Sequence, residues 1–175
     1  MGVAARSAAR RAGAVAAVTA LAFALTGCGG DRPAPAGSRF AEGGVAVSVR
    51  VESSGGGLRV VADLRPERDG FHLYSLALPD GGIDGIGIPT RIGAEGALRP
   101  EGPASTDAGE RVLRPAGLDV GLPVYRDGQV TLVLPVRRVT GEDHARVMLS
   151  YGACSERDGC LMPVRDRAVT LTLDD

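Results

Sequence analysis

Two cysteines near the C-terminus, Cys154 and Cys160, are the residues of this sequence with the clearest chemical potential. They flank a polar segment that ends in Gly159, and runs of alternating apolar residues lie on both sides of the pair. This arrangement predicts a β-hairpin with one cysteine on each arm. Facing Cα atoms in a non-hydrogen-bonded antiparallel pair are about 4.5 Å apart, which a disulfide can span. The spacing therefore allows a disulfide between the two arms.

Three interpretations of this cysteine pair remain open from spacing alone. As a structural crosslink it closes a small loop, for which the chain-entropy model gives a stabilisation of the folded state of about 2 kcal/mol. As a redox pair it exchanges with a partner disulfide through a mixed-disulfide intermediate. Two thiolates and the thioether of Met162 could also hold a soft metal such as Cu(I). The spacing favours the crosslink, then exchange, and metal binding least.

The N-terminal segment has the pattern of an export signal. Three arginines precede an uncharged run from Ala12 to Leu25, which is too short to span a bilayer and suits the apolar region of a signal peptide. The run ends in Leu-Thr-Gly-Cys28, which resembles a bacterial lipobox, where the cysteine is lipidated and becomes the first residue. An ordinary secretory signal with a chance cysteine is the alternative. We expect a signal peptide at residues 1–27 and a lipid anchor on Cys28.

Composition and motifs limit the function of the exported part. The sequence has 20 basic and 21 acidic residues, and three of the basic ones lie in the predicted signal peptide, so the remainder is mildly acidic. This balance argues against nucleic acid as a partner. With Cys28 lipidated, Cys154 and Cys160 are an even pair in an oxidising compartment. The sequence has no P-loop, G-x-S-x-G or H-E-x-x-H motif, so we expect no cofactor, no resident metal and no hydrolase activity.

The rest of the chain has the pattern of a β-protein. Residues 28–42 are rich in Pro and Gly and predict a flexible tether. Residues 43–175 predict one folded domain of short strands without helical periodicity, which indicates an antiparallel β-sandwich. Residues 93–120 are the least regular part. The predicted strands are Val45–Val51, Leu58–Leu64, Phe71–Leu78, an edge strand at Ile86–Ile92, Arg111–Leu113, Val130–Val136, Arg146–Tyr151 and Ala168–Leu173.

The run Tyr151-x-x-Cys154-x5-Cys160-x-x-Pro163, followed by a terminal strand, resembles the N-terminal domain of the thiol:disulfide interchange protein DsbD, also called the disulfide-bond corrector domain. Three further stretches fit in the same order: Gly70–Tyr74, Pro79–Thr90 and Gly121–Asp127. The resemblance covers residues 43–175. It implies an immunoglobulin-like sandwich with a redox-active cysteine pair.

The resemblance also implies roles for individual residues. Cys160 would form the mixed disulfide and Cys154 would resolve it. His72 and Tyr74 would line the site together with Pro163, although a histidine on a strand can also be an ordinary strand residue. The loop that shields the cysteines in this family has no clean match, since Leu118-Asp119-Val120 stands in its place without an aromatic residue.

The resemblance further implies partners and a location. The family domain receives electrons from a thioredoxin-like protein and delivers them to exported thiol proteins. DsbD continues into a membrane-embedded domain and a thioredoxin-like domain, whereas this sequence ends at Asp175, so we expect the membrane-embedded electron donor to be a separate protein. We expect a monomer on the outer face of the cytoplasmic membrane or in the periplasm. A non-catalytic, lipid-anchored binding module with a structural disulfide, and less so a copper-handling lipoprotein, are the alternatives.

Overall fold

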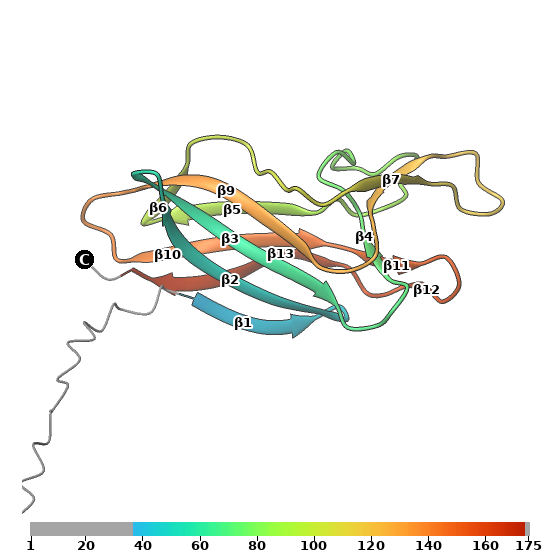
Figure 1. The fold of residues 1–175 in the computed structure, drawn as a ribbon, viewed down its shortest axis with the longest axis horizontal. Coiled ribbons are helices and arrows are strands. Elements are labelled where there is room, and N and C mark those ends of the chain that lie inside the picture. Colours follow the sequence, from blue (N-terminus) through green and yellow to red (C-terminus); the bar gives the residue numbers. More distant parts are fainter. Residues whose placement is uncertain (1–36, 174–175) are drawn as a thin grey trace, which may run out of the picture. The chain divides into compact units, whose positions relative to one another are not determined.

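The computed structural model describes residues 37–173, and these contain no helix. Every paired strand in this range runs antiparallel to its neighbour. The strands, shown in Figure 1, are β1 (Gly37–Glu42), β2 (Val45–Ser54), β3 (Gly57–Pro66), β4 (His72–Leu73), β5 (Arg91–Gly96), β6 (Leu98–Pro100), β7 (Glu110–Leu113), β8 (Leu122–Tyr125), β9 (Val130–Arg138), β10 (His144–Tyr151), β11 (Ala153–Ser155), β12 (Gly159–Cys160) and β13 (Val164–Thr172).

Two sheets form the layers of a β-sandwich. The larger has the order β1-β2-β3-β9-β6, and the smaller has the order β13-β10-β5 (Figure 1). Buried side chains from both sheets belong to one apolar cluster, with Val47 and Leu132 from the larger sheet and Val147 and Leu171 from the smaller. Burial of this apolar surface is the main stabilising contribution to the fold. The predicted antiparallel β-sandwich is confirmed.

The β2–β3 hairpin shows how the sequence pattern specifies the larger sheet. Val45, Val47 and Val49 are buried while the residues between them are partly exposed, as period-2 alternation predicts. The strands are joined by Gly55 and Gly56, whose φ angles are +58° and +88°. A two-residue turn of this kind needs positive φ at both positions, and glycine adopts it without steric cost.

Two predicted strands are wrong in extent or position. The stretch Phe71–Leu78 is extended only at β4, because the chain then turns: the Ala77 N–H donates to Ser75 Oγ, 2.8 Å away. The Arg91 guanidinium donates to the carbonyls of this loop, including that of Leu78 at 2.6 Å. Most of the stretch is buried, although Ala77 is exposed, and this burial explains its apolar composition.

The strand predicted at Ile86–Ile92 begins later, at Arg91, and runs to Gly96 as β5. Gly85 and Gly87 have φ angles of +76° and +92°, which interrupt an extended backbone. Ile83 and Ile86 instead pair across a tight turn. One edge strand of the smaller sheet is therefore β5, which pairs with β10.

The N-terminal boundary of the folded part also differs from the expectation. Residues 37–42, assigned from composition to the tether, form β1 and pair with β2. The predicted signal peptide, Cys28 and the first part of the tether lie outside the described residues. Within residues 37–173, there is no helix with the length and apolarity needed to cross a membrane.

Candidate redox site

The cysteine hairpin forms a small third sheet with the order β12-β11-β4. Cys154 and Cys160 face each other with Cα atoms 4.0 Å apart, and their sulfur atoms are bonded. The Leu161 N–H donates to the Ala153 carbonyl at 2.9 Å, so the cysteines occupy the adjacent non-hydrogen-bonded position. The hairpin and the pairing that the spacing allows are both present.

The tip of the hairpin is stabilised by its own side chains. Ser155 Oγ accepts the backbone N–H groups of Arg157 and Asp158, each at 3.3 Å. Gly159 has a φ angle of +78°, and nothing lies within 4 Å of a Cβ built on it. The position therefore favours glycine because of its backbone conformation and not because a side chain would clash. These local hydrogen bonds stabilise the turn that joins the two cysteine-bearing arms.

The two cysteines differ in exposure. Cys154 is buried, with 5% of its surface exposed, whereas Cys160 is exposed. Met162 and Pro163, which follow Cys160, are exposed as well, and Met162 reaches 81%. Cys160 is therefore the cysteine that lies at the surface, and an attack of a thiolate on its sulfur would make Cys154 the leaving group.

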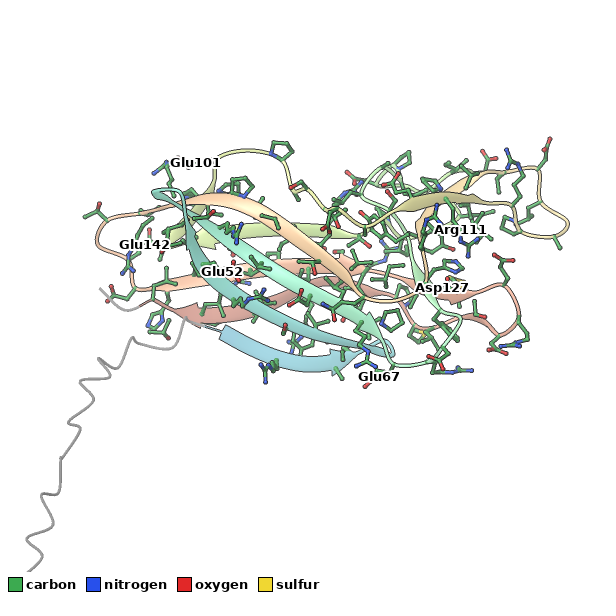
Figure 2. All side chains as sticks on the ribbon, viewed as in Figure 1. Glu52, Glu67, Glu101, Arg111, Asp127 and Glu142 are labelled. Atoms are coloured by element: carbon green, nitrogen blue, oxygen red, sulfur yellow. A yellow bond between two sulfur atoms is a disulfide. The ribbon has the colours of Figure 1, made fainter. Side chains whose placement is uncertain are left out.

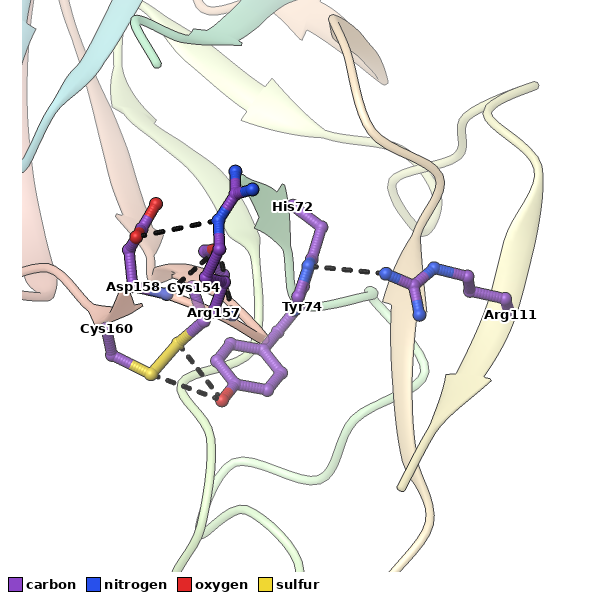
Figure 3. Close-up of a disulfide and its surroundings, with 8 residues drawn as sticks. His72, Tyr74, Arg111, Cys154, Arg157, Asp158 and Cys160 are labelled. Atoms are coloured by element: carbon purple, nitrogen blue, oxygen red, sulfur yellow. Dashed lines mark hydrogen bonds and ion pairs between the residues drawn. A yellow bond between two sulfur atoms is a disulfide. The ribbon is translucent and has the colours of Figure 1, made fainter. Parts of the chain in front are cut away.

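The hydroxyl of Tyr74 lies against the disulfide (Figure 3). Its oxygen is 3.2 Å from Cys154 Sγ and 4.0 Å from Cys160 Sγ. Disulfide sulfurs carry no hydrogen, so the Tyr74 O–H is the donor. Burial raises the pKa of Tyr74 above its ordinary value, which keeps this hydroxyl protonated at neutral pH. The Tyr74 hydroxyl is therefore close enough to donate a hydrogen bond to Cys154 Sγ, whereas it lies farther from Cys160 Sγ.

Close packing holds the Tyr74 ring in this position. Thr90 Oγ1 donates to the Tyr74 carbonyl at 2.5 Å. A Cβ at Gly87 would lie 2.7 Å from Leu78 Cδ2 and 3.0 Å from Tyr74 Cε1, and φ there is +92°. A Cβ at Gly152 would lie 3.4 Å from Tyr74 Cδ2. Because Gly87 and Gly152 have no Cβ, the loop that contains Gly87 and the backbone before β11 can approach the Tyr74 ring closely.

His72 stands opposite Cys154 in the β4–β11 pair and is 1% exposed. Its Nδ1 lies 3.5 Å from an Arg111 guanidinium nitrogen and 4.0 Å from Asp127 Oδ1. Burial lowers the pKa of His72, and the Arg111 charge lowers it further, while Asp127 and Glu156 act in the opposite direction. His72 is therefore neutral at physiological pH.

Arg111 connects His72 to the cysteine hairpin. Its guanidinium lies 2.8 Å from Glu156 Oε1 at the hairpin tip and 3.7 Å from Asp127 Oδ1 in the turn after β8. Arg111 and Asp127 lie at the end of the domain that carries the β11–β12 hairpin (Figure 2). The three side chains are partly or largely exposed, so each pair contributes no more than about 1 kcal/mol to stability. Through Arg111, these contacts connect the hairpin tip and the turn after β8 to His72 Nδ1.

The structure brings together most, but not all, of the residues predicted for the site. Cys154, Cys160, His72 and Tyr74 are adjacent. Leu118 is 47% exposed and is not part of the buried cluster that contains Cys154, whereas Val120 packs against that cluster. Within the described part of the chain, no group of three or more His, Cys, Asp or Glu residues is arranged to hold a metal ion.

Arg111, Asp127 and Glu156 were not predicted as site residues. They come from β7, from the turn after β8 and from the hairpin tip, and only the pairing of distant strands brings them into contact. Charged residues in turns are ordinary in any sequence, so no local pattern distinguishes these three. Their roles become visible only in three dimensions.

Together, fold and site define an antiparallel β-sandwich domain with a hairpin disulfide that joins a buried cysteine to an exposed one. Comparisons of the sequence with protein-family models and with curated proteins find no match. Among solved structures, the domain is similar to the N-terminal periplasmic domain of ScsB from Proteus mirabilis, with a TM-score of 0.54 and 16% identity over 80% of this chain and 52% of that one. It is also similar to the Neisseria meningitidis DsbD N-terminal domain in the reduced form, with a TM-score of 0.46 and 18% identity over 75% of this chain and 86% of that one.

The protein thus has a DsbD-like N-terminal domain fold, as the sequence resemblance predicted. The chain spans about half the length of the ScsB chain that it matches. At this level of identity the similarity concerns the fold. The chemistry of the domain depends on the residues of its own site.

Proposed function

We propose that this protein exchanges thiols and disulfides outside the cytoplasm, passing electrons between a thioredoxin-like or membrane-embedded donor and exported thiol proteins through Cys154 and Cys160. The observation that carries the proposal is the asymmetry of the disulfide. Cys160 is exposed, and Cys154 is buried with a hydroxyl donor 3.2 Å from its sulfur. A crosslink that serves only stability needs neither feature. The shared fold supports the proposal.

The exchange proceeds in two displacements. A thiolate of the reduced partner attacks Cys160 Sγ, the Cys154–Cys160 bond breaks, and its electron pair leaves on Cys154 Sγ. A second thiolate of the partner then attacks the partner's own sulfur in the mixed disulfide and releases Cys160. The partner is oxidised to a disulfide and this domain is reduced to a dithiol. Delivery to an exported disulfide reverses these steps, with Cys160 attacking and Cys154 resolving.

Tyr74 assists the first displacement in this scheme. Negative charge develops on the buried Cys154 sulfur, where desolvation opposes it. The Tyr74 O–H donates to that sulfur already in the oxidised state and keeps its hydrogen throughout. Hydrogen bonds to charged groups contribute about 1.5–3 kcal/mol. The hydroxyl therefore makes Cys154 a better leaving group.

Replacing Tyr74 with Phe is expected to slow reduction of the disulfide about tenfold, the effect of roughly 1.4 kcal/mol on a barrier. Stopped-flow reduction by dithiothreitol, followed by thiol trapping, measures the second-order rate constant. Tyr151→Phe is the matched control, because the Tyr151 hydroxyl donates to the Glu42 carbonyl and not to a sulfur. Equal rate constants for Tyr74→Phe and Tyr151→Phe would remove Tyr74 from the mechanism.

The exchange function itself is tested with a reduced, exported thioredoxin-like protein as the electron donor. The oxidised domain is mixed with it, quenched at intervals and alkylated to count free thiols. Appearance of two thiols in this domain together with a disulfide in the donor supports the proposal. If no such donor reduces the disulfide, the result would contradict the proposal and favour a structural crosslink.

We further propose that the domain is held on the extracytoplasmic face of a bacterial membrane by lipid on Cys28, after removal of residues 1–27. The lipobox-like Leu-Thr-Gly-Cys sequence supports this. Since β1 begins at Gly37, the tether between lipid and domain is residues 28–36 in this proposal. Incorporation of labelled fatty acid into the full chain, and its recovery with membranes, tests the anchor separately from the redox activity.

A further inference from the structure

Three side chains form a row across the β12-β11-β4 sheet. Cys160, Cys154 and His72 occupy directly paired positions on successive strands. Residues paired in this way project from the same face of an antiparallel sheet, with Cβ atoms about 4.5–5.5 Å apart. Cys154 therefore has Cys160 on one flank and His72 on the other.

The position of the hydrogen on His72 follows from its neighbour. Arginine can only donate hydrogen bonds, so the contact of 3.5 Å between Arg111 and Nδ1 makes Nδ1 an acceptor. In a neutral imidazole the hydrogen then sits on Nε2. That atom is buried and has no hydrogen-bond partner among the described residues. A buried donor without an acceptor is destabilising and is rare in folded proteins.

We propose that His72 is a positioning residue for the reduced state, in which its Nε2–H donates to the sulfur of Cys154. In the oxidised domain that sulfur is bonded to Cys160 and held on the opposite flank. When an external thiolate attacks Cys160, the electron pair passes to Cys154 Sγ, which is then free to rotate about the Cα–Cβ bond toward His72. His72 and Tyr74 both donate to it and keep their hydrogens. This inference rests on the proposed exchange function and adds that the reduced form is specifically stabilised.

The charged and titratable groups around His72 are consistent with this role. Arg111 from β7, Asp127 from the turn after β8, Glu156 from the hairpin tip and Tyr74 beside β4 surround it. Arg111 is paired with both carboxylates, so its charge is largely compensated. The contribution of His72 is therefore a directed N–H group, with Arg111 fixing which nitrogen carries the hydrogen.

Two variants of the full chain test this role, His72→Phe, which removes the donor, and His72→Gln, which keeps a side-chain N–H. Equilibration with glutathione at pH 7 and thiol trapping gives the equilibrium constant for reduction. We expect His72→Phe to shift this constant about tenfold toward the disulfide, which corresponds to about 30 mV for two electrons. His72→Gln should recover most of the shift. Equal constants for wild type and His72→Phe would overturn the inference.

A second measurement separates this inference from the proposed function. In a Cys160→Ser background, the Cys154 thiol is titrated by its thiolate absorbance, and adding His72→Phe should move the titration to higher pH. This readout needs no redox partner. A shift here, with no donor able to reduce the wild type, would contradict exchange but support the role of His72. An unchanged titration in a domain that exchanges normally would contradict the role of His72 alone.

The wild-type protein provides a test that does not depend on the folding of a variant. Nitrogen-15 NMR of the histidine side chains reports which ring nitrogen carries the hydrogen. We expect Nε2–H in both redox states, with the Nε2 resonance shifted on reduction as the N–H gains an acceptor. The same Nε2 resonance in oxidised and reduced protein, or a hydrogen on Nδ1, would contradict the inference.

Discussion

Cys154→Ser is expected to turn this domain into a trap that stays disulfide-bonded through Cys160 to a partner without a second thiol, such as glutathione, whereas Cys160→Ser is expected to abolish adduct formation. The reason is the difference in exposure: Cys160 is exposed, and Cys154 is 5% exposed beneath the Tyr74 hydroxyl. Without Cys154, nothing in the hairpin can resolve the mixed disulfide. With only Cys154, an incoming disulfide does not reach the sulfur.

Glutathione disulfide is a suitable probe for this prediction, with mass spectrometry of the intact protein as the readout. The Cys154→Ser variant should gain one glutathione, and the Cys160→Ser variant should remain unmodified under the same conditions. The two variants are matched controls for each other, since each removes one sulfur from the same hairpin. The reverse pattern would assign the attacked sulfur to Cys154 and contradict the proposed order of steps.

Leu149→Ala is expected to lower the free energy of unfolding by about 2–5 kcal/mol, the range for large-to-small changes in a packed core. Leu149 is 0% exposed and lies on β10, the central strand of the smaller sheet. Strand β10 ends at Tyr151, and the cysteine arm β11 begins at Ala153, so loss of packing here also loosens the support of the hairpin.

Urea denaturation followed by circular dichroism measures this change in the oxidised domain. Val112→Ala is the control, because Val112 is 55% exposed and its truncation should change stability by no more than about 0.5 kcal/mol. A loss below about 1 kcal/mol for Leu149→Ala would mean that the core around β10 collapses onto the vacancy, contrary to close packing between the two sheets.

The parts of the fold that were predictable are those specified by local pattern. Alternation of Val45, Val47 and Val49 marks a half-buried strand, and the paired glycines after Ser54 mark a tight hairpin. The cysteine hairpin was likewise predictable, because turn residues lie between two short arms. In each case, neighbouring residues alone determine the conformation.

The parts that were wrong depend on distant contacts. The apolar run from Phe71 to Leu78 suits a strand or a buried loop equally well, and the observed loop accepts a hydrogen bond at the Leu78 carbonyl from Arg91, which is distant in sequence. The later start of β5 depends on its pairing with β10 and on positive φ angles at Gly85 and Gly87. Short apolar runs do not by themselves distinguish these outcomes.

The site residues also divide into those that the sequence predicted and those that depend on contacts between distant segments. The cysteine pair was visible in the sequence, and His72 and Tyr74 were predicted through the family resemblance. The network of Arg111 with Glu156 joins residues 45 positions apart and could not be inferred from either segment. Leu118 was predicted from its place in the chain, but the β7–β8 connection leaves it exposed and places Val120 against the cluster that contains Cys154.

The reduction potential of the Cys154–Cys160 pair tests the central claim most directly. It is obtained by equilibrating the protein with glutathione mixtures and counting alkylated thiols. Exchange-active pairs have potentials between roughly −270 and −120 mV, and we expect a value in that range. Structural disulfides of exported proteins usually lie below about −300 mV. A value well below that limit, with slow exchange, would contradict the proposed carrier and identify the disulfide as a structural crosslink.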